Sequence, residues 1–157
     1  MKYIIPGLLL ILLVAGCVTQ DESVSSQSNF SQDMTFDEAN VSISEPEKIE
    51  VYHFHATRQC YSCITVGDYA DETVKTYFAE ELKSGKIVFA HINGDLPENA
   101  ELVEKYGAAG SSLWIGVYDE NGFHAEQNTN VWYKIKDKEE YMTYLKGVLE
   151  NKLKGVA

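Results

Sequence analysis

The chain has 157 residues, with 24 acidic side chains against 13 basic ones, a formal net charge of −11 at pH 7, and three cysteines. This acidic balance opposes binding to nucleic acid and to anionic lipid surfaces, so neither is expected as an electrostatic partner. Residues 47–157 are numerous enough to bury one hydrophobic core but not two.

Residues 1–16 predict an export signal. Lys2 is followed by an almost wholly apolar run at 4–15, which is shorter than the roughly 20 residues needed to span a bilayer. Residues 14–17 (Val-Ala-Gly-Cys) resemble a lipobox, the cleavage motif of lipoproteins. The resemblance implies cleavage before Cys17 and a lipid on its sulfur. An uncleaved segment would instead be a marginal membrane anchor, and both alternatives place the rest of the chain outside the cytoplasm.

Residues 17–46 are predicted to be a tether that begins at the lipidated cysteine. After Cys17 the segment is acidic, rich in Ser, Gln and Asn, and has no Lys or Arg. Such a composition cannot bury enough apolar surface to offset the entropy of ordering the chain. We therefore expect residues 17–46 to be disordered and residues 47–157 to form a single folded domain.

The folded domain is predicted to run strand, helix, strand, helix, strand, strand, helix. An apolar, β-prone run predicts the first strand at 49–55, and apolar residues at helical spacing predict a long helix from about Cys60 to Lys83. Gly67 inside this helix lowers its stability and permits a kink. Residues 87–92 are almost continuously apolar, which is typical of a strand buried on both faces.

The second half of the domain is predicted from turn and capping signals. Asn-Gly is a strong hairpin signal, and an acidic residue followed three positions later by Glu resembles a helix capping box. The expected elements are a short helix from Asp95 to Tyr106, a strand at 113–118, a hairpin turn at 119–122, a strand at 123–127 and a last helix opened by Asp137 and Glu140.

Cys60 and Cys63 form a C-x-x-C pair where the first strand gives way to the long helix. If the helix begins at the motif, unpaired backbone N–H groups and the helix dipole stabilise a thiolate on Cys60, and Arg58 adds positive charge nearby. Cys63 follows one helical turn later, close enough to form a small disulfide. This arrangement predicts a dithiol redox switch.

Two other interpretations of the cysteine pair stay open. A C-x-x-C is half of many zinc sites, but the chain has no second cysteine pair, so histidines would have to complete the site. The two cysteines could also be structural. With one cysteine lipidated, the pair accounts for the other two thiols, and an extracytoplasmic setting lets a disulfide persist. The available histidines are His53, His55, His91 and His124.

The order of these elements, with C-x-x-C between the first strand and the first long helix, resembles the thioredoxin fold over residues 49–153. Residues 106–110 (Tyr-Gly-Ala-Ala-Gly) resemble the approach to the active-site loop of that fold. Residues 54–63 and 82–86 are similar to small lipoproteins named as nitrophenyl-compound nitroreductase subunits. The resemblance implies an α/β, thioredoxin-like domain with a central mixed sheet of about four strands flanked by about three helices.

The resemblance also implies roles for both cysteines. Cys60 matches the attacking cysteine, which forms a mixed disulfide with a protein partner, and Cys63 matches the resolving cysteine, which releases the partner and closes the ring. The redox-active Cys60–Cys63 disulfide then serves without any dissociable cofactor. Tyr61 and Ser62, between the cysteines, are expected to tune the reduction potential.

The sequence departs from the thioredoxin pattern at two positions. The cis-proline that faces the motif in the family falls at Ser112, beside Ser111, and its loss opens room for a metal next to the sulfurs. The buried acid that accepts a proton in thioredoxin falls at Phe54. Of the neighbouring histidines, which titrate near neutral pH, His55 comes before His53 as the candidate proton acceptor. The alternative for each is a histidine that only packs.

Together these features predict a thiol-disulfide oxidoreductase that acts on protein partners and is held on the extracytoplasmic face of the cell membrane by lipid on Cys17. One alternative is a carrier of a thiophilic metal such as Cu(I), bound by Cys60, Cys63 and a histidine. Others are a redox subunit of a larger envelope complex and a binding module whose disulfide is a permanent staple. The residues do not set whether the pair oxidises, reduces or isomerises its partners.

Overall fold

The computed structural model describes residues 45–156. The predicted export signal, Cys17 and nearly all of the predicted tether lie outside these residues. Among the residues that are described, no helix combines the length and the apolar character needed to cross a membrane.

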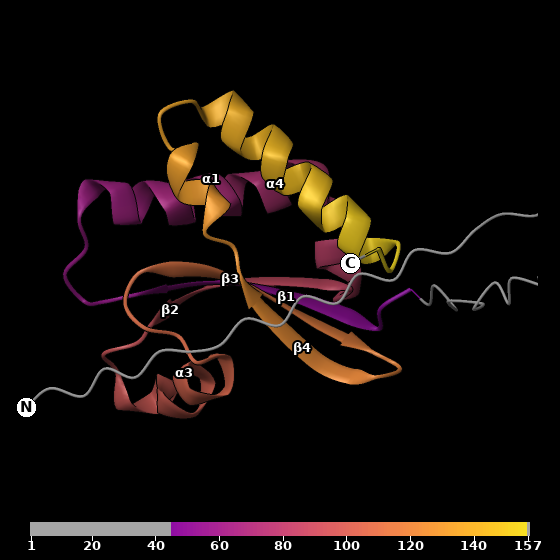
Figure 1. Ribbon diagram of the computed structural model, residues 1–157, viewed down its shortest axis with the longest axis horizontal. Helices are drawn as coiled ribbons and strands as arrows, with labels where there is room; N and C mark the ends of the chain where they lie inside the picture. Colours follow the sequence, from indigo (N-terminus) through magenta and orange to yellow (C-terminus); the bar gives the residue numbers. More distant parts are fainter. Residues whose placement is uncertain (1–44, 157) are drawn as a thin grey trace, which may run out of the picture. The chain divides into compact units, whose positions relative to one another are not determined.

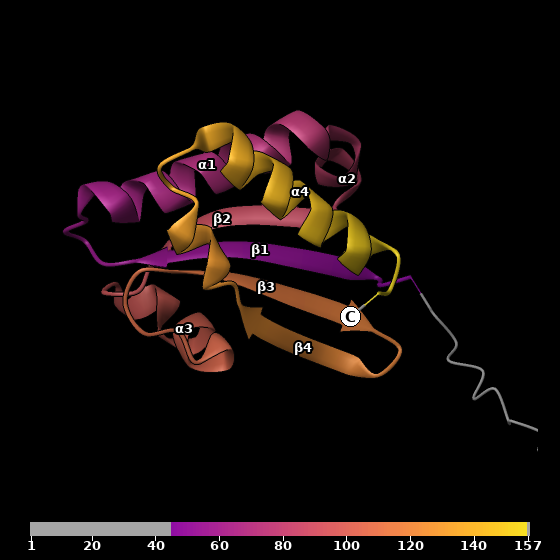
Figure 2. The same ribbon diagram turned by 45° about the horizontal axis from the view of Figure 1, so that its top comes forward.

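A mixed sheet of four strands forms the centre of the domain. Its strands are β1 (Lys48–His55), β2 (Ile87–Asn93), β3 (Ser112–Asp119) and β4 (Gly122–Gln127), and their order in the sheet is β2-β1-β3-β4. β1 runs parallel to β2 and antiparallel to β3, which is joined to β4 by the predicted hairpin, as Figure 2 shows. The predicted mixed sheet is thereby confirmed.

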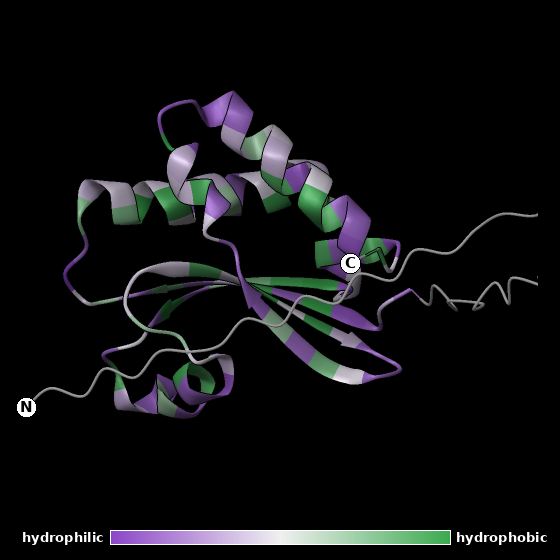
Figure 3. Cartoon of the chain, in the orientation of Figure 1, coloured by the Kyte–Doolittle hydropathy of each residue, from purple (hydrophilic) through white to green (hydrophobic). Residues whose placement is uncertain are grey.

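Helices cover both faces of this sheet, so that it is the middle layer of three. α1 (Tyr61–Tyr77) and α4 (Lys138–Leu153) lie over one face, and α3 (Ala100–Tyr106) lies over the other (Figure 1). α2 (Ala79–Ser84) follows α1, and two short 3-10 helices, η1 (Pro97–Asn99) and η2 (Asn130–Tyr133), precede α3 and α4. The hydrophobic residues of α1 lie mostly on its side toward the sheet, as Figure 3 shows.

Each face of the sheet has its own hydrophobic cluster. The larger cluster lies under α1 and α4, because alternate residues of β1 point to that side. The smaller cluster lies under α3 and contains the aromatic rings of Tyr52, Phe54 and Tyr106. The fully buried members of the larger cluster include Ile49, Val51, Val66, Ala70, Val74, Leu113, Ile115, Tyr141, Leu145 and Leu149.

The long helix predicted from Cys60 to Lys83 is two helices, and that prediction was wrong in its length. The break falls at Phe78, whose backbone leaves the helical region at φ −130° and ψ 34°. Phe78 is 3% exposed and packs into the larger cluster, so the break keeps this ring in the core. Gly67 does not produce the break. Gly85 ends α2 in the left-handed conformation, which favours glycine at the end of a helix.

The strand predicted to be buried on both faces is also corrected. β2 lies at an edge of the sheet, and of its residues only Ile87 is buried. The central strand is β1, in which every residue from Ile49 to Phe54 is buried. An apolar run marks a strand, but its place in the sheet depends on which strands pair with it.

Of the two hydrogen bonds of the predicted capping box at the last helix, the one accepted by Asp137 is confirmed. The Asp137 carboxylate accepts a hydrogen bond from the backbone N–H of Glu140 at 3.0 Å. The Glu140 side chain pairs with Lys134 at 2.6 Å instead of reaching back to the cap. The cap therefore satisfies one of the free N–H groups at the start of α4.

Candidate functional site

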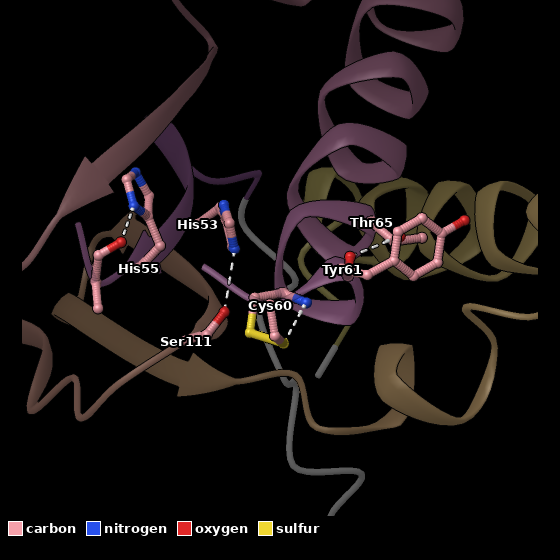
Figure 4. The surroundings of a disulfide bond; sticks show 8 residues. His53, His55, Cys60, Tyr61, Thr65 and Ser111 are labelled. Atoms are coloured by element: carbon pink, nitrogen blue, oxygen red, sulfur yellow. Dashed lines mark hydrogen bonds between the residues drawn. A yellow bond between two sulfur atoms is a disulfide. The ribbon is translucent and has the colours of Figure 1, made fainter. Parts of the chain in front are cut away.

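The candidate site is built where β1 ends and α1 begins. After His55 the chain makes a short loop, and Cys60 is the N-cap of α1, with an extended backbone at φ −81° and ψ 164°. Its sulfur accepts a hydrogen bond from the backbone N–H of Cys63 at 3.1 Å (Figure 4). The sulfur thus occupies the position that an N-cap oxygen usually takes, where helix N–H groups and the dipole favour negative charge.

Cys60 and Cys63 are joined by a disulfide, with their Cα atoms 5.1 Å apart. Cys60 is exposed, whereas Cys63 is half-buried. A partner sulfur can therefore approach Cys60 from solvent, while Cys63 is more sheltered. The roles of attacking and resolving cysteine stay predictions, and the difference in exposure is the feature that they would use.

The residues around the motif form an open surface. Tyr61 is 82% exposed and Ile64 is 44% exposed, and Arg58 is exposed on the approach loop. Ser62 is half-buried. The tuning roles predicted for Arg58, Tyr61 and Ser62 stay predictions. All three residues lie at or just before the N-terminus of α1, close in sequence to the disulfide.

His53 is the histidine that lies directly behind the motif. His53 is 1% exposed, and its Nδ1 lies 3.0 Å from Nδ1 of His91. Its Nε2 lies 3.4 Å from the Ser111 hydroxyl, as Figure 4 shows. Burial lowers the pKa of His53 to about 4, aided by the nearby His91 and His55, while a contact with the Cys63 backbone raises it. The ring is therefore neutral at pH 7.

Gly67 makes this placement of His53 possible. A Cβ atom at position 67 would overlap the His53 ring, because the helix backbone passes directly against it. The sequence suggested only that Gly67 permits a kink, whereas the structure shows that this position needs glycine for close packing. A signal for this role existed, since Gly67 lies four residues after Cys63 and therefore on the same side of α1.

His55 has a different environment from the one expected of a proton acceptor for the motif. It is half-buried, its Nδ1 lies 3.0 Å from the carbonyl oxygen of Ala56, and its ring stacks on His53 with centroids 5.4 Å apart. His53, rather than His55, contacts the Cys63 backbone. Sequence reasoning considered His91 only as a possible metal ligand and missed its place as the register partner of His53 across the parallel β1–β2 pair.

The two serines at the predicted cis-proline position have separate roles in the loop. Ser112 is fully buried, and its hydroxyl accepts a hydrogen bond from Trp114 Nε1 at 3.0 Å and donates to the Gly110 carbonyl at 3.4 Å. Ser111 is half-buried and reaches His53. Of the two, Ser111 is the residue that the fold connects to the surroundings of the disulfide.

Phe54, which the resemblance places where thioredoxin has its acid, is buried, and among the described residues the buried acidic side chain is Glu50. Its carboxylate accepts hydrogen bonds from Lys48 at 2.7 Å, Tyr106 at 2.7 Å and Tyr118 at 2.9 Å. Burial raises the pKa of Glu50, but the three hydrogen bonds together outweigh it and leave the pKa lowered. Because its partners come from α3 and β3, we interpret Glu50 as a structural anchor of the smaller cluster.

A metal centre would need at least three suitable ligands. Within residues 45–156 there is no group of three or more His, Cys, Asp and Glu side chains placed to hold a metal ion. The cysteine pair and one histidine are therefore not arranged as a closed site in the part of the chain that is described. The metal-carrier alternative thus gains no support from the geometry.

Comparisons with known proteins find similar solved structures but no family. No protein-family model and no curated protein matches the chain. Among solved structures, the Trx4 domain of ERdj5 is 18% identical, with a TM-score of 0.42, over 69% of this chain and 87% of that chain. Plasmodium falciparum thioredoxin is 16% identical, with a TM-score of 0.39, over 62% of this chain and 74% of that one. The strand order, the strand directions and the disulfide at the start of α1 give this chain a thioredoxin-like fold.

Proposed function

We propose that the protein is a thiol-disulfide oxidoreductase that exchanges disulfides with protein partners through Cys60 and Cys63. The observation that carries the proposal is the exposed Cys60 sulfur at the N-cap of α1, bonded to a less exposed Cys63. A helix N-terminus stabilises a thiolate, and the thiolate is the form that attacks a disulfide.

The exchange balances in two steps. In the reduced protein the Cys60 thiolate attacks one sulfur of a partner disulfide, the partner's S–S bond breaks, and one partner thiolate leaves. The Cys63 thiolate then attacks the Cys60 sulfur, which releases the second partner thiolate and closes the Cys60–Cys63 disulfide. The partner gains two electrons and the protein loses two. The same steps in reverse oxidise a dithiol partner.

The open surface around the motif supports a protein rather than a small molecule as partner. Tyr61 and Ile64 offer apolar contact beside the sulfur, and both are well exposed. Aromatic side chains give large contact areas with little loss of conformational freedom. A macromolecule that presents a disulfide on its own surface can therefore dock here without a deep pocket.

The experiment is a disulfide-reduction assay with insulin as a model substrate. The wild-type chain should reduce insulin over many turnovers in the presence of dithiothreitol, and Cys60→Ser should remove this activity. Cys63→Ser should stop at a mixed disulfide between Cys60 and insulin that dithiothreitol releases, because no resolving thiol remains. A Cys60–Cys63 disulfide that resists dithiothreitol, with no mixed disulfide formed, would contradict the proposal and favour a permanent staple.

A further inference from the structure

We propose that His53 and His91, together with the Ser111 hydroxyl, form a proton relay that links the buried side of Cys63 to solvent. The inference rests on the proposed function, because it concerns the step in which Cys63 must lose its proton before it can attack. Phe54, which the resemblance places where thioredoxin has its buried acid, cannot take this proton, and His53 is a buried titratable group beside the motif.

The relay begins at the inner side of the motif. His53 is buried between β1 and α1, contacts the Cys63 backbone, and meets the Ser111 hydroxyl through Nε2 at 3.4 Å. Gly67 leaves room for the ring in this position, because a glycine has no Cβ and the helix backbone can pack directly on the imidazole. His53 therefore presents a hydrogen-bonding nitrogen to the loop and helix that surround the disulfide.

The relay continues from His53 to His91. Their Nδ1 atoms are 3.0 Å apart, a distance at which one nitrogen must carry a proton and the other must accept it. A neutral imidazole has one N–H and one free nitrogen, so a proton can enter at one side of the His53 ring while another leaves at the other side. The ring then passes a proton without holding a net charge for long, as its burial requires.

The relay ends at solvent, because His91 is exposed on β2. The charged and titratable groups that face the histidine pair are His55 on β1 and Asp68, Asp71 and Lys75 on α1. Burial lowers the pKa of His91, the carboxylates of Asp71 and Asp68 raise it, and His55 and Lys75 lower it, so that the pKa is lowered overall. A proton that reaches His91 is therefore released readily to the water around its exposed ring.

In the proposed step one proton passes from Cys63 to water through three side chains. The proton of the Cys63 thiol moves by way of the Ser111 hydroxyl to Nε2 of His53, while the proton on Nδ1 of His53 moves to His91, and His91 gives a proton to water. The resulting thiolate attacks the Cys60 sulfur, and the S–S bond to the partner breaks. The departing partner thiolate takes up a proton from solvent. No net proton or electron remains on the relay.

The test separates the two sulfur steps with dithiobis-nitrobenzoate, which releases one coloured thiolate when Cys60 attacks it and a second when Cys63 resolves the mixed disulfide. It uses the full chain carrying Cys17→Ser, so that only the reduced pair reacts. The first phase depends on reagent concentration and the second does not. His53→Gln should slow only the second phase, by at least about tenfold near pH 6.5, with recovery at high pH where hydroxide takes the thiol proton directly.

His91→Gln provides the second variant, because its side chain is exposed and its loss does not open the core. Its second phase should be slower, and free imidazole in the buffer should restore the rate by replacing the solvent-facing member of the relay. His124→Gln is the matched control, since His124 is exposed on β4 beside Asp119, and it should change neither phase.

The outcomes are distinguishable. A wild-type chain without a fast first phase would contradict the proposed function itself, whatever the histidines do. A normal first phase together with an unchanged second phase and pH profile in His53→Gln would overturn the relay. If His53→Gln does not fold, an unchanged second phase in folded His91→Gln overturns it instead, and imidazole rescue of that variant supports it.

Discussion

His53 is the residue on which we propose that the chemistry and the stability of this domain both depend. It is a titratable side chain in a buried position, and it is held there by contacts with His91, Ser111 and the backbone of α1. A buried imidazole needs a hydrogen-bond partner for each ring nitrogen. Both nitrogens have one here, which is why the ring is stable inside although it is polar.

We predict that acid destabilises the oxidised domain through His53. The unfolded chain binds a proton at this residue below about pH 6.5, whereas the folded chain does so only near its lowered pKa of about 4. The free energy of unfolding should therefore fall as the pH is lowered from about 6.5 to about 4, by about 3 kcal/mol, and this contribution should be constant below that range. Above about pH 6.5 the ring is neutral in both states.

Urea unfolding at a series of pH values measures this effect. His53→Gln should lower the difference in unfolding free energy between pH 7 and pH 4.5, even if the substitution weakens the domain at every pH. His124→Gln, at an exposed site, should keep the wild-type difference. Identical pH dependence in the wild-type chain and His53→Gln would show that His53 does not titrate as its surroundings require.

At this scale the sequence predicts only part of the site. Cys60 and Cys63 could be found because the C-x-x-C spacing and the start of a helix are local features. The pairing of His53 with His91 could not, because it depends on the register of two strands that are far apart in the chain. Ser111 and Glu50 likewise acquire their partners only when separate elements pack.

The elements that position the site are α1 and β1, and the close contact between them depends on a glycine. Gly67 and Gly147 both lie inside helices, where glycine weakens a helix relative to alanine. Their surroundings differ. A Cβ at 67 would overlap the His53 ring, whereas a Cβ at 147 would have no neighbour within 4 Å.

We predict opposite effects of the same substitution at the two glycines. Gly67→Ala should destabilise the domain by about 1–3 kcal/mol, because the His53 ring must move out of a packed core. Gly147→Ala should stabilise it by up to about 1 kcal/mol through helix propensity. Urea unfolding of both variants at pH 7 gives the comparison, and a stabilising Gly67→Ala would mean that α1 and His53 are not in contact in solution.

The fold at the level of elements was largely predictable, and its errors have physical causes. The hairpin, the αL glycine after α2 and the cap of α4 follow from local turn and capping chemistry. The break at Phe78 does not, because it results from the burial of that ring against the sheet. The position of β2 at the edge depends on strand pairing, which an apolar run does not encode.

At the scale of the whole molecule, the folded domain and the segment before it have different proposed tasks. Nothing in the described residues attaches the domain to a membrane by a spanning helix. We propose that lipid on Cys17 anchors the chain, and that the acidic residues before the domain hold it away from the bilayer. An acidic chain with a net charge of −11 would not stay at an anionic surface by electrostatics alone.

This proposal predicts where the protein is found in the cell. The wild-type chain should sediment with membranes and be released by detergent but not by high salt, because the acyl chains insert into lipid. Cys17→Ser should move it to the soluble fraction or leave its signal uncleaved, with the domain unchanged. A wild-type chain that salt alone releases would contradict a lipid anchor.

The central claim is that the Cys60 sulfur is held as a reactive thiolate at the start of α1, and its rate of alkylation by iodoacetamide in the reduced chain tests this most directly. An ordinary thiol, with a pKa of about 8.5, loses close to a hundredfold in rate between pH 8 and pH 6, in proportion to its thiolate. We predict that Cys60 loses less than about tenfold over this range, while Cys63 stays slow. A loss at Cys60 equal to that of free glutathione would contradict the account.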